Sequence, residues 1–182
     1  MESRGALDSV QRVKQICGQV FRYAVATGSA ERDVTQDLKG ALAKSTPGNF
    51  AAITDPIKAG ELMRSIFDYS GHAYTVAALK LSPILFVRPG ELRKAEWAEV
   101  NLDTAEWVIP GQKMKMKLDQ IVPLSKQAIA ILTDLKLITG HGKYVFPSLR
   151  TGERPMSENT INAALRGMGY AADVHSAHGF RA

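Results

Sequence analysis

The chain has 182 residues, of which 45% are hydrophobic and 23% are charged, a composition typical of a folded globular protein and unlike that of a fibrous or disordered one. The sequence holds no apolar run of about 18 residues for a membrane helix and no N-terminal secretory signal, and its single cysteine, Cys17, excludes an internal disulfide. The balance of 23 Lys and Arg against 18 Asp and Glu gives a net charge of +5, which favours a polyanionic partner. We therefore expect a cytoplasmic protein with no membrane partner.

Two helices are predicted in the first 45 residues. Residues 9–26 carry apolar side chains at steps of three and four, the period of an amphipathic helix. Asp33 is a candidate N-cap, with Gln36 in the capping-box position, for a second helix that runs to about residue 43. Two such helices are too small for a stable domain, so we expect residues 1–45 to be the incomplete end of a larger helical module.

A turn-forming segment, Ser-Thr-Pro-Gly-Asn at 45–49, marks the best boundary in the sequence. We predict a linker over residues 46–54 and a second domain over 55–182. In this domain Asp55 and Pro56 open a helix, and its predicted buried residues are Ile57, Leu62, Met63, Ile66 and Phe67.

The rest of the second domain predicts an α+β fold that is mostly α. Residues 72–86 form a nearly continuous apolar helix, expected at the centre of the core, and a short helix follows Arg88. Residues 106–110 and 120–124 are short β-like runs that predict a small antiparallel sheet or hairpin. Ser125 and Ser157 are predicted to cap two further helices, and a last helix is expected to begin at His178.

Arg88 and Glu91 are three residues apart at the start of the predicted short helix. Such a pair can be an ordinary salt bridge on a solvated turn. Alternatively, the planar guanidinium of Arg88 is a clamp for a phosphate, with Glu91 holding it in place.

Lys113, Lys115 and Lys117 alternate with methionines between the two β-like runs. In an extended segment this alternation places the three lysines on one face. That face is either a solvated hairpin edge or a surface that contacts a DNA backbone, with one ammonium delivered to a reaction centre.

His178 and Arg181 have the spacing of neighbours on one helical face, a pattern that is common by chance. His175 and His178 share this spacing, but no cysteine or acidic cluster accompanies them, so a metal site is not expected. Trp97, Trp107 and other aromatic residues are predicted to pack in the core or hairpin and not to stack on bases. The sequence also lacks a phosphate-binding loop, a nucleophile elbow and a dinucleotide fingerprint.

Taken in order, these motifs resemble those of the tyrosine recombinases, specifically the phage and prophage integrases. The matching runs are V-R-P-G-E-L at 87–92, W-V-I-P at 107–110, M-K-M-K at 114–117, V-P-L-S at 122–125, Y-V-F-P at 144–147, P-M-S-E-N-T at 155–160 and A-H-G-F-R-A at 177–182. The resemblance implies a DNA breaking-rejoining catalytic domain over residues 55–182 and the end of a core-binding (SAM-like) domain over residues 1–45.

The resemblance also implies a site-specific recombinase that acts on double-stranded DNA attachment sites together with other integrase protomers. By position, Arg88 is the first catalytic arginine, His178 and Arg181 form the His-x-x-Arg pair, and Lys115 is the hairpin lysine. Lys113 and Lys117 remain register alternatives for that lysine and otherwise candidate DNA contacts. The family forms a 3′-phosphotyrosyl link to DNA without a metal or a cofactor.

In the family, a further His or Trp and then the nucleophilic tyrosine follow the His-x-x-Arg pair by several dozen residues. The tyrosines of this sequence all precede that pair, and none matches the nucleophile. We therefore expect an integrase fragment that is inactive by itself. The alternative is a non-catalytic DNA-binding or regulatory remnant of an integrase.

Overall fold

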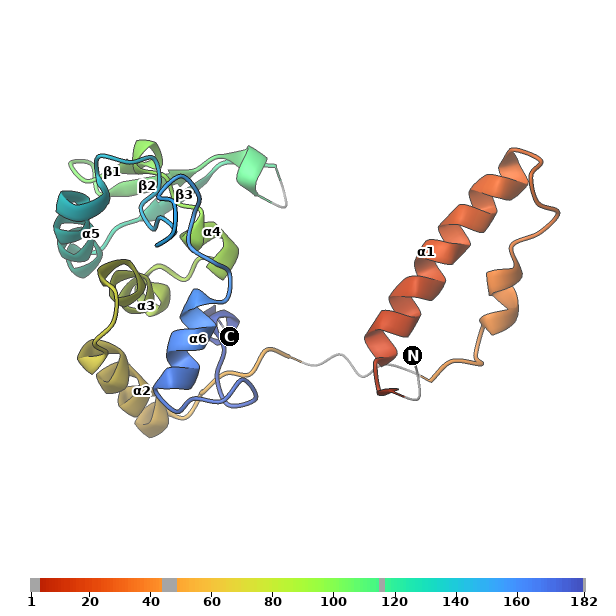
Figure 1. The fold of residues 1–182 in the computed structure, drawn as a ribbon, viewed down its shortest axis with the longest axis horizontal. Coiled ribbons are helices and arrows are strands. Elements are labelled where there is room, and N and C mark those ends of the chain that lie inside the picture. Colours follow the sequence, from red (N-terminus) through yellow and green to blue (C-terminus); the bar gives the residue numbers. More distant parts are fainter. Residues whose placement is uncertain (1–3, 44–48, 115–116, 182) are drawn as a thin grey trace. The chain divides into compact units, whose positions relative to one another are not determined.

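The computed structural model describes residues 4–43, 49–114 and 117–181 (Figure 1). The chain divides into two compact units, Met1–Asn49 and Phe50–Ala182. The division falls inside the segment 46–54.

The first unit contains α1 (Leu7–Ala26) and a 3₁₀ helix, Val34–Leu38. Asp33 caps the 3₁₀ helix as predicted, because its Oδ1 accepts hydrogen bonds from the backbone N–H and the hydroxyl of Thr35. The prediction of a helix that continues to residue 43 is wrong. Lys39 is already extended, and Gly40 has a φ of 83°, a left-handed conformation that ends helical structure.

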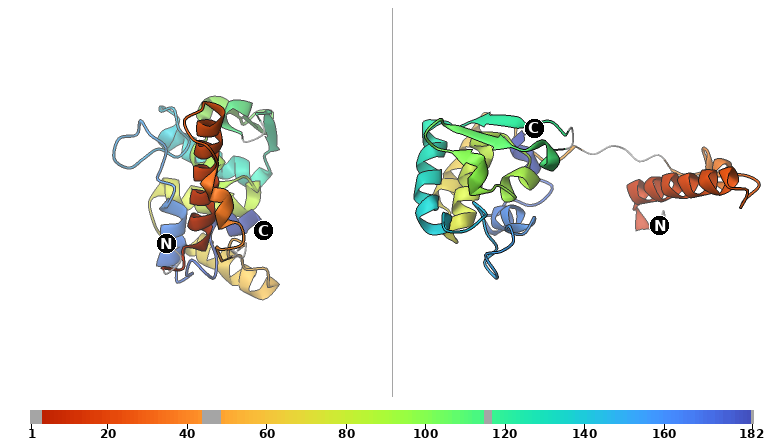
Figure 2. Two further views of the ribbon diagram at one scale, coloured as in Figure 1. Left: turned by 90° about the vertical axis from the view of Figure 1, so that its right-hand side faces the viewer. Right: turned by 90° about the horizontal axis from the view of Figure 1, so that it is seen from above.

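In the second unit, one apolar helix lies at the centre, as predicted. This helix, α3 (Ala73–Leu85), contacts the other α-helices except α1 as well as the 3₁₀ helix Ala177–Arg181 (Figures 1 and 2). Its neighbours are α2 (Pro56–Asp68), α4 (Pro89–Arg93), α5 (Lys126–Thr139) and α6 (Thr160–Gly167). Ala78, Leu79 and Leu81 are fully buried, so α3 supplies the middle of the core.

Two predicted helix starts are confirmed by their caps. Asp55 accepts a hydrogen bond from the Lys58 N–H at 2.9 Å, and Ser125 accepts one from the Ala128 N–H at 3.2 Å. The Ser157 prediction is wrong by two residues: its hydroxyl accepts from the Asn159 N–H, and Asn159 is the N-cap of α6.

The predicted buried face of α2 is too wide. Leu62 and Ile66 are buried, four residues apart on one side of the helix. Ile57 and Phe67 are 74% and 54% exposed, because each lies turned away from that narrow stripe. The Lys80 ammonium lies 5.2 Å from the centre of the Phe67 ring.

The sheet is antiparallel, with strand order β1 (Val100–Asn101), β2 (Glu106–Ile109) and β3 (Gln120–Pro123). The predicted hairpin is therefore confirmed, with Trp107 opposite Val122. Strand β1 was not predicted, because two residues are too few to show an alternating pattern. The α+β fold class, mostly α with a small antiparallel sheet, is confirmed. None of the helices in the described parts of the chain has the length and apolarity to cross a bilayer.

Candidate functional site

A cavity of about 450 Å³ in the second unit brings together four of the predicted site residues. Arg88 and Glu91 reach it from the start of α4, Lys113 from the base of the β2–β3 loop, and His178 from the 3₁₀ helix Ala177–Arg181. Arg88 and His178 are far apart in the sequence, so only the fold places them on one cavity.

Arg88 is the N-cap of α4, where Pro89 begins the helix with a suitable φ. The Arg88 backbone N–H donates to Glu91 Oε2 at 2.7 Å, and its guanidinium donates to Glu91 Oε1 at 2.6 Å. The Glu91 side chain is 7% exposed, whereas that of Arg88 is 41% exposed. Glu91 thus orients the arginine, and the exposed part of the guanidinium keeps donors for an anion in the cavity.

Lys113 is held by acidic residues. Its ammonium pairs with Glu96 at 2.7 Å and with Glu99, and it donates to the Lys94 carbonyl. Burial lowers the pKa of Lys113, but the hydrogen bonds and charges of Glu96 and Glu99 outweigh this effect and raise it. The hydrogen bond from Lys113 in turn lowers the pKa of Glu96. Lys113 is therefore a firmly charged anchor at the base of the loop.

The base of the β2–β3 loop is closed and not extended. Gly111–Lys113 is a 3₁₀ turn, the Gly111 N–H donates to Asp119 Oδ1 at 2.7 Å, and a Cβ at Gly111 would lie 2.6 Å from the Lys117 carbonyl oxygen. Lys117 is exposed and has a φ of 54°. The expectation that Lys113 lies in an extended segment is wrong, because the chain turns at 111–113. Lys115 lies outside the described residues.

The predicted last helix is a 3₁₀ helix, Ala177–Arg181, which begins one residue earlier than expected. The Ala177 N–H donates to Asn162 Oδ1 at 2.8 Å, which joins this helix to α6. His178 is exposed, lines the cavity and stacks on Phe50 with ring centres 4.1 Å apart. Arg181 is exposed but does not line the cavity. Arg88 and His178 thus meet at the cavity, and Arg181 does not join them there.

His175 is a buried histidine that the sequence analysis considered only as a metal ligand. Its Nδ1 accepts a hydrogen bond from the Ile53 N–H at 3.1 Å, and its ring packs edge-on against Phe180. No group of three or more His, Cys, Asp or Glu in the described segments could hold a metal ion. An imidazole that accepts at Nδ1 in a buried position is neutral, and burial lowers the pKa of His175.

This lowered pKa predicts an acid-sensitive fold. The unfolded chain takes up a proton at His175 near the ordinary value of 6.5, whereas the folded chain does so at lower pH. The contribution of His175 to the free energy of unfolding should therefore be complete above about pH 6.5. The free energy of unfolding should fall as the pH is lowered toward the folded-state pKa. Urea unfolding across this pH range measures it. His175→Asn should flatten the dependence, and His141→Asn, at an exposed histidine, should leave it as in the wild type. An identical pH dependence in His175→Asn would contradict the assignment.

The cavity carries a near balance of charge. Arg88, Arg93, Lys94 and Lys113 face three glutamates, Glu91, Glu99 and Glu158. Glu91 pairs with Arg88 and Glu99 pairs with Lys113, so two of the cations are held by carboxylates of the cavity. Sequence reasoning missed Arg93, which donates to the Met156 carbonyl at 3.1 Å, and Asn162, because nothing in their local sequence marks either position.

The aromatic residues behave as predicted. Trp107 is 2% exposed, and the Trp97 indole N–H donates to the backbone oxygen and the hydroxyl of Thr139. Tyr144 pairs with Glu96 in an isolated β-bridge. These residues are structural.

Solved structures of integrases share this fold. A lambda integrase dimer bound to a COC′ core site superposes with a TM-score of 0.71 at 17% identity, covering 98% of this chain and 63% of that one. The Tn1549 transposon integrase in complex with a circular intermediate DNA superposes with a TM-score of 0.73 at 10% identity, covering 100% and 66%. The second unit therefore has the fold of a tyrosine recombinase catalytic domain.

The family follows from the sequence comparison. The family described as "Phage integrase family" matches residues 57–182, and "Phage integrase central domain" matches residues 1–41. The chain belongs to the phage integrase family.

Curated relatives include the integrase of Enterobacteria phage P4, 36% identical over 100% of this chain and 44% of that protein. The putative protein IntB of Escherichia coli K12 is 34% identical over 100% of this chain and 49% of that protein. The chain spans about half the length of these relatives.

Proposed function

We propose that this chain is part of an integrase that performs site-specific DNA recombination, inserting or excising a mobile element. The observation that carries the proposal is the cavity in which Arg88, oriented by Glu91, and His178 meet from distant parts of the sequence. Membership of the phage integrase family supports the same activity.

The side chains of the cavity suit attack on a phosphodiester. Such an attack builds negative charge on the non-bridging oxygens, and fixed guanidinium donors stabilise this charge. Arg88 is assigned to these oxygens. His178 is assigned to proton transfer, because an imidazole gains and loses a proton near neutral pH. Arg181 is proposed as the second arginine, brought to the phosphate when DNA occupies the cavity.

The three lysines between β2 and β3 are assigned different roles. The carboxylates around Lys113 hold its proton tightly, which makes it an anchor of the loop and a poor proton donor. Lys115 keeps its proposed role as the acid that protonates the leaving 5′-oxygen. Lys117, exposed beside the loop base, is proposed to contact the DNA backbone along with the outer face of Lys113.

We further propose that residues 1–182 do not form a covalent link to DNA by themselves. The five tyrosines are described, and none lines the cavity. Tyr170 shares a hydrogen bond with Ser65 at 3.1 Å, and Tyr144 is tied to Glu96 by the β-bridge. In-line attack tolerates little misplacement, since an error of about 1 Å costs about a hundredfold in rate.

A nicked suicide substrate with the crossover sequence of the mobile element tests this proposal. On a denaturing gel, the 182-residue chain should give no shifted protein–DNA band. A chain that continues through the family's nucleophilic tyrosine should give one, and Arg88→Ala should abolish it. A covalent band from residues 1–182 would contradict the proposal and identify one of the present tyrosines as the nucleophile.

A second candidate function is a non-catalytic DNA-binding or regulatory remnant. The absence of a tyrosine from the lining of the described cavity favours it. It predicts duplex binding by residues 1–182 and no adduct even from a longer chain. In either case the proposed partners are double-stranded DNA and other integrase protomers, in the cytoplasm and without a cofactor. The lambda integrase structures hold DNA as a dimer on a core site and as a tetramer on a Holliday junction.

A further inference from the structure

The start of the second unit is fastened to the segment that carries His178 and Arg181. Ile53 donates its N–H to His175 Nδ1 at 3.1 Å. The carbonyl of Ala51 accepts hydrogen bonds from the N–H of Ser176 at 3.0 Å and from its hydroxyl at 3.3 Å. These bonds join parts of the sequence that are more than 100 residues apart, and they hold the two residues that directly precede the 3₁₀ helix.

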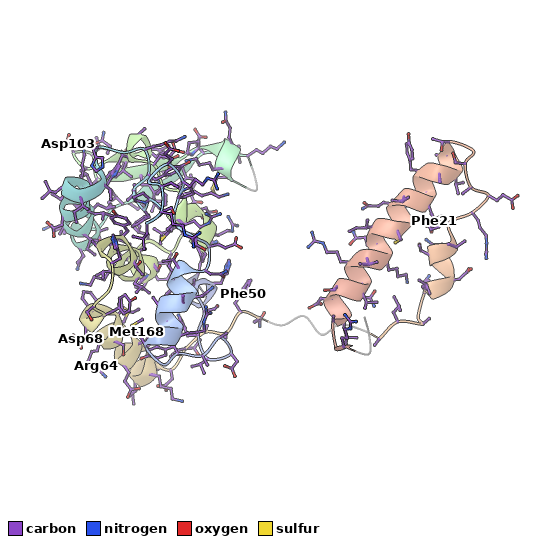
Figure 3. All side chains as sticks on the ribbon, viewed as in Figure 1. Phe21, Phe50, Arg64, Asp68, Asp103 and Met168 are labelled. Atoms are coloured by element: carbon purple, nitrogen blue, oxygen red, sulfur yellow. The ribbon has the colours of Figure 1, made fainter. Side chains whose placement is uncertain are left out.

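The same segment touches the site directly. Phe50 stacks on His178 with an angle of 15° between the rings, and Figure 3 labels Phe50 where the chain enters the second unit. Gly179 passes so close to this segment that a Cβ there would lie 2.4 Å from the Ala51 carbonyl oxygen. Residues 50–53, which we call the clamp segment, therefore contact the 3₁₀ helix at His178 and Gly179.

His175 is the buried centre of this contact. It is 3% exposed, and its Nε2 has no hydrogen-bond partner among the described residues. A buried polar atom without a partner costs free energy. The hydrogen bond that Nδ1 accepts from Ile53 is the contact that offsets this cost and favours a histidine here. An apolar side chain would fill the space without this cost but could not accept the Ile53 N–H.

We propose that His175 is a positioning residue, which fastens the clamp segment to the 3₁₀ helix and thereby sets where His178 and Arg181 are presented to DNA. This inference rests on the proposed function of the site. His175 does not line the cavity, so it acts through its neighbours and not on the phosphate.

Two substitutions of His175 separate the contribution of its Nδ1 acceptor from that of its aromatic ring. His175→Asn places an amide oxygen at the position of Nδ1 and removes the ring, whereas His175→Phe keeps a ring against Phe180 and removes the acceptor. Duplex DNA binding of the 182-residue chain is measured by fluorescence anisotropy at about pH 7.5, where histidine is mostly neutral. His175→Phe should bind about fivefold more weakly, the equivalent of one hydrogen bond, and His175→Asn should stay within about twofold of the wild type.

A double-mutant cycle shows whether the effect passes through the 3₁₀ helix. In a background that carries both His178→Ala and Arg181→Ala, His175→Phe should cause no further loss of DNA affinity. General destabilisation would instead add to the loss from these two substitutions. Equal DNA affinity of His175→Phe and the wild type, or a loss that Asn does not rescue, would overturn the inference.

Phe50 provides a second route if His175→Phe fails to fold. Phe50 is 65% exposed, so Phe50→Ala should leave the fold intact. It should weaken DNA binding about twofold in the wild type and have no effect in a His178→Ala background. Equal effects in both backgrounds would overturn the clamp. If Arg88→Ala and Arg181→Ala both leave DNA affinity unchanged, the proposed function itself fails, which is a separate result.

Discussion

Replacing Arg88 with alanine should weaken binding of duplex DNA by about 10- to 100-fold. A hydrogen bond to a charged group contributes about 1.5–3 kcal/mol, and Arg88 presents its donors to the cavity already oriented by Glu91. The variant also leaves the Glu91 carboxylate, 7% exposed, without its guanidinium partner and next to the DNA phosphate. Fluorescence anisotropy against salt concentration measures both effects, and the log–log slope should fall by about one.

The control for Arg88→Ala is the double variant Arg88→Ala with Glu91→Gln. Removal of the stranded carboxylate should restore part of the lost affinity, because only the repulsion is relieved. Arg32→Ala is a matched arginine control, since Arg32 pairs with Asp37 on the surface of the first unit. A loss for Arg32→Ala as large as for Arg88→Ala would mean that binding follows total charge and not the cavity.

Replacing Phe146 with alanine should lower the free energy of unfolding of the second unit by about 3–5 kcal/mol. Phe146 is 1% exposed and is the largest of the fully buried side chains. Its backbone carbonyl accepts from Met156, so the surrounding chain is held and cannot collapse into the space left behind. A single well-packed aromatic residue therefore decides whether the unit stays folded.

Urea unfolding followed by tryptophan fluorescence measures this loss for the second unit alone, because both tryptophans, Trp97 and Trp107, lie in it. Leu137→Ala is the matched control: Leu137 is 85% exposed, and its removal should change the free energy by less than about 0.5 kcal/mol. Similar losses for the two variants would contradict the described core.

Local chemistry made much of the fold predictable from the sequence. The caps at Asp55 and Ser125 depend on residues within one turn, and the hairpin depends on two short alternating runs. The helix predicted after Asp33 failed because the left-handed Gly40 follows too soon for a full helix, and glycine does not reveal its φ in advance. Strand β1 exists only because β2 lies beside it.

The site was predictable by motif and not by geometry. Arg88 and His178 were identified by a family resemblance and Glu91 by its spacing from Arg88, and the structure places all three on one cavity. The ion pairs of Lys113 depend on Glu96 and Glu99, which adopt their places through folding that no local pattern encodes. The same holds for His175, because its hydrogen-bond partner Ile53 is 122 residues away in the sequence.

The histidine resonances of the 182-residue chain test the central claim, that Arg88 and His178 bind the same DNA phosphate. The chain has four histidines, at positions 72, 141, 175 and 178, and single substitutions assign their ring signals in a ¹H–¹³C NMR spectrum. On addition of a short duplex, the His178 signal should shift while those of His72 and His141 stay in place, and Arg88→Ala should remove the shift. A His178 signal that does not move at DNA concentrations that saturate the anisotropy, or that moves equally in Arg88→Ala, would contradict the claim.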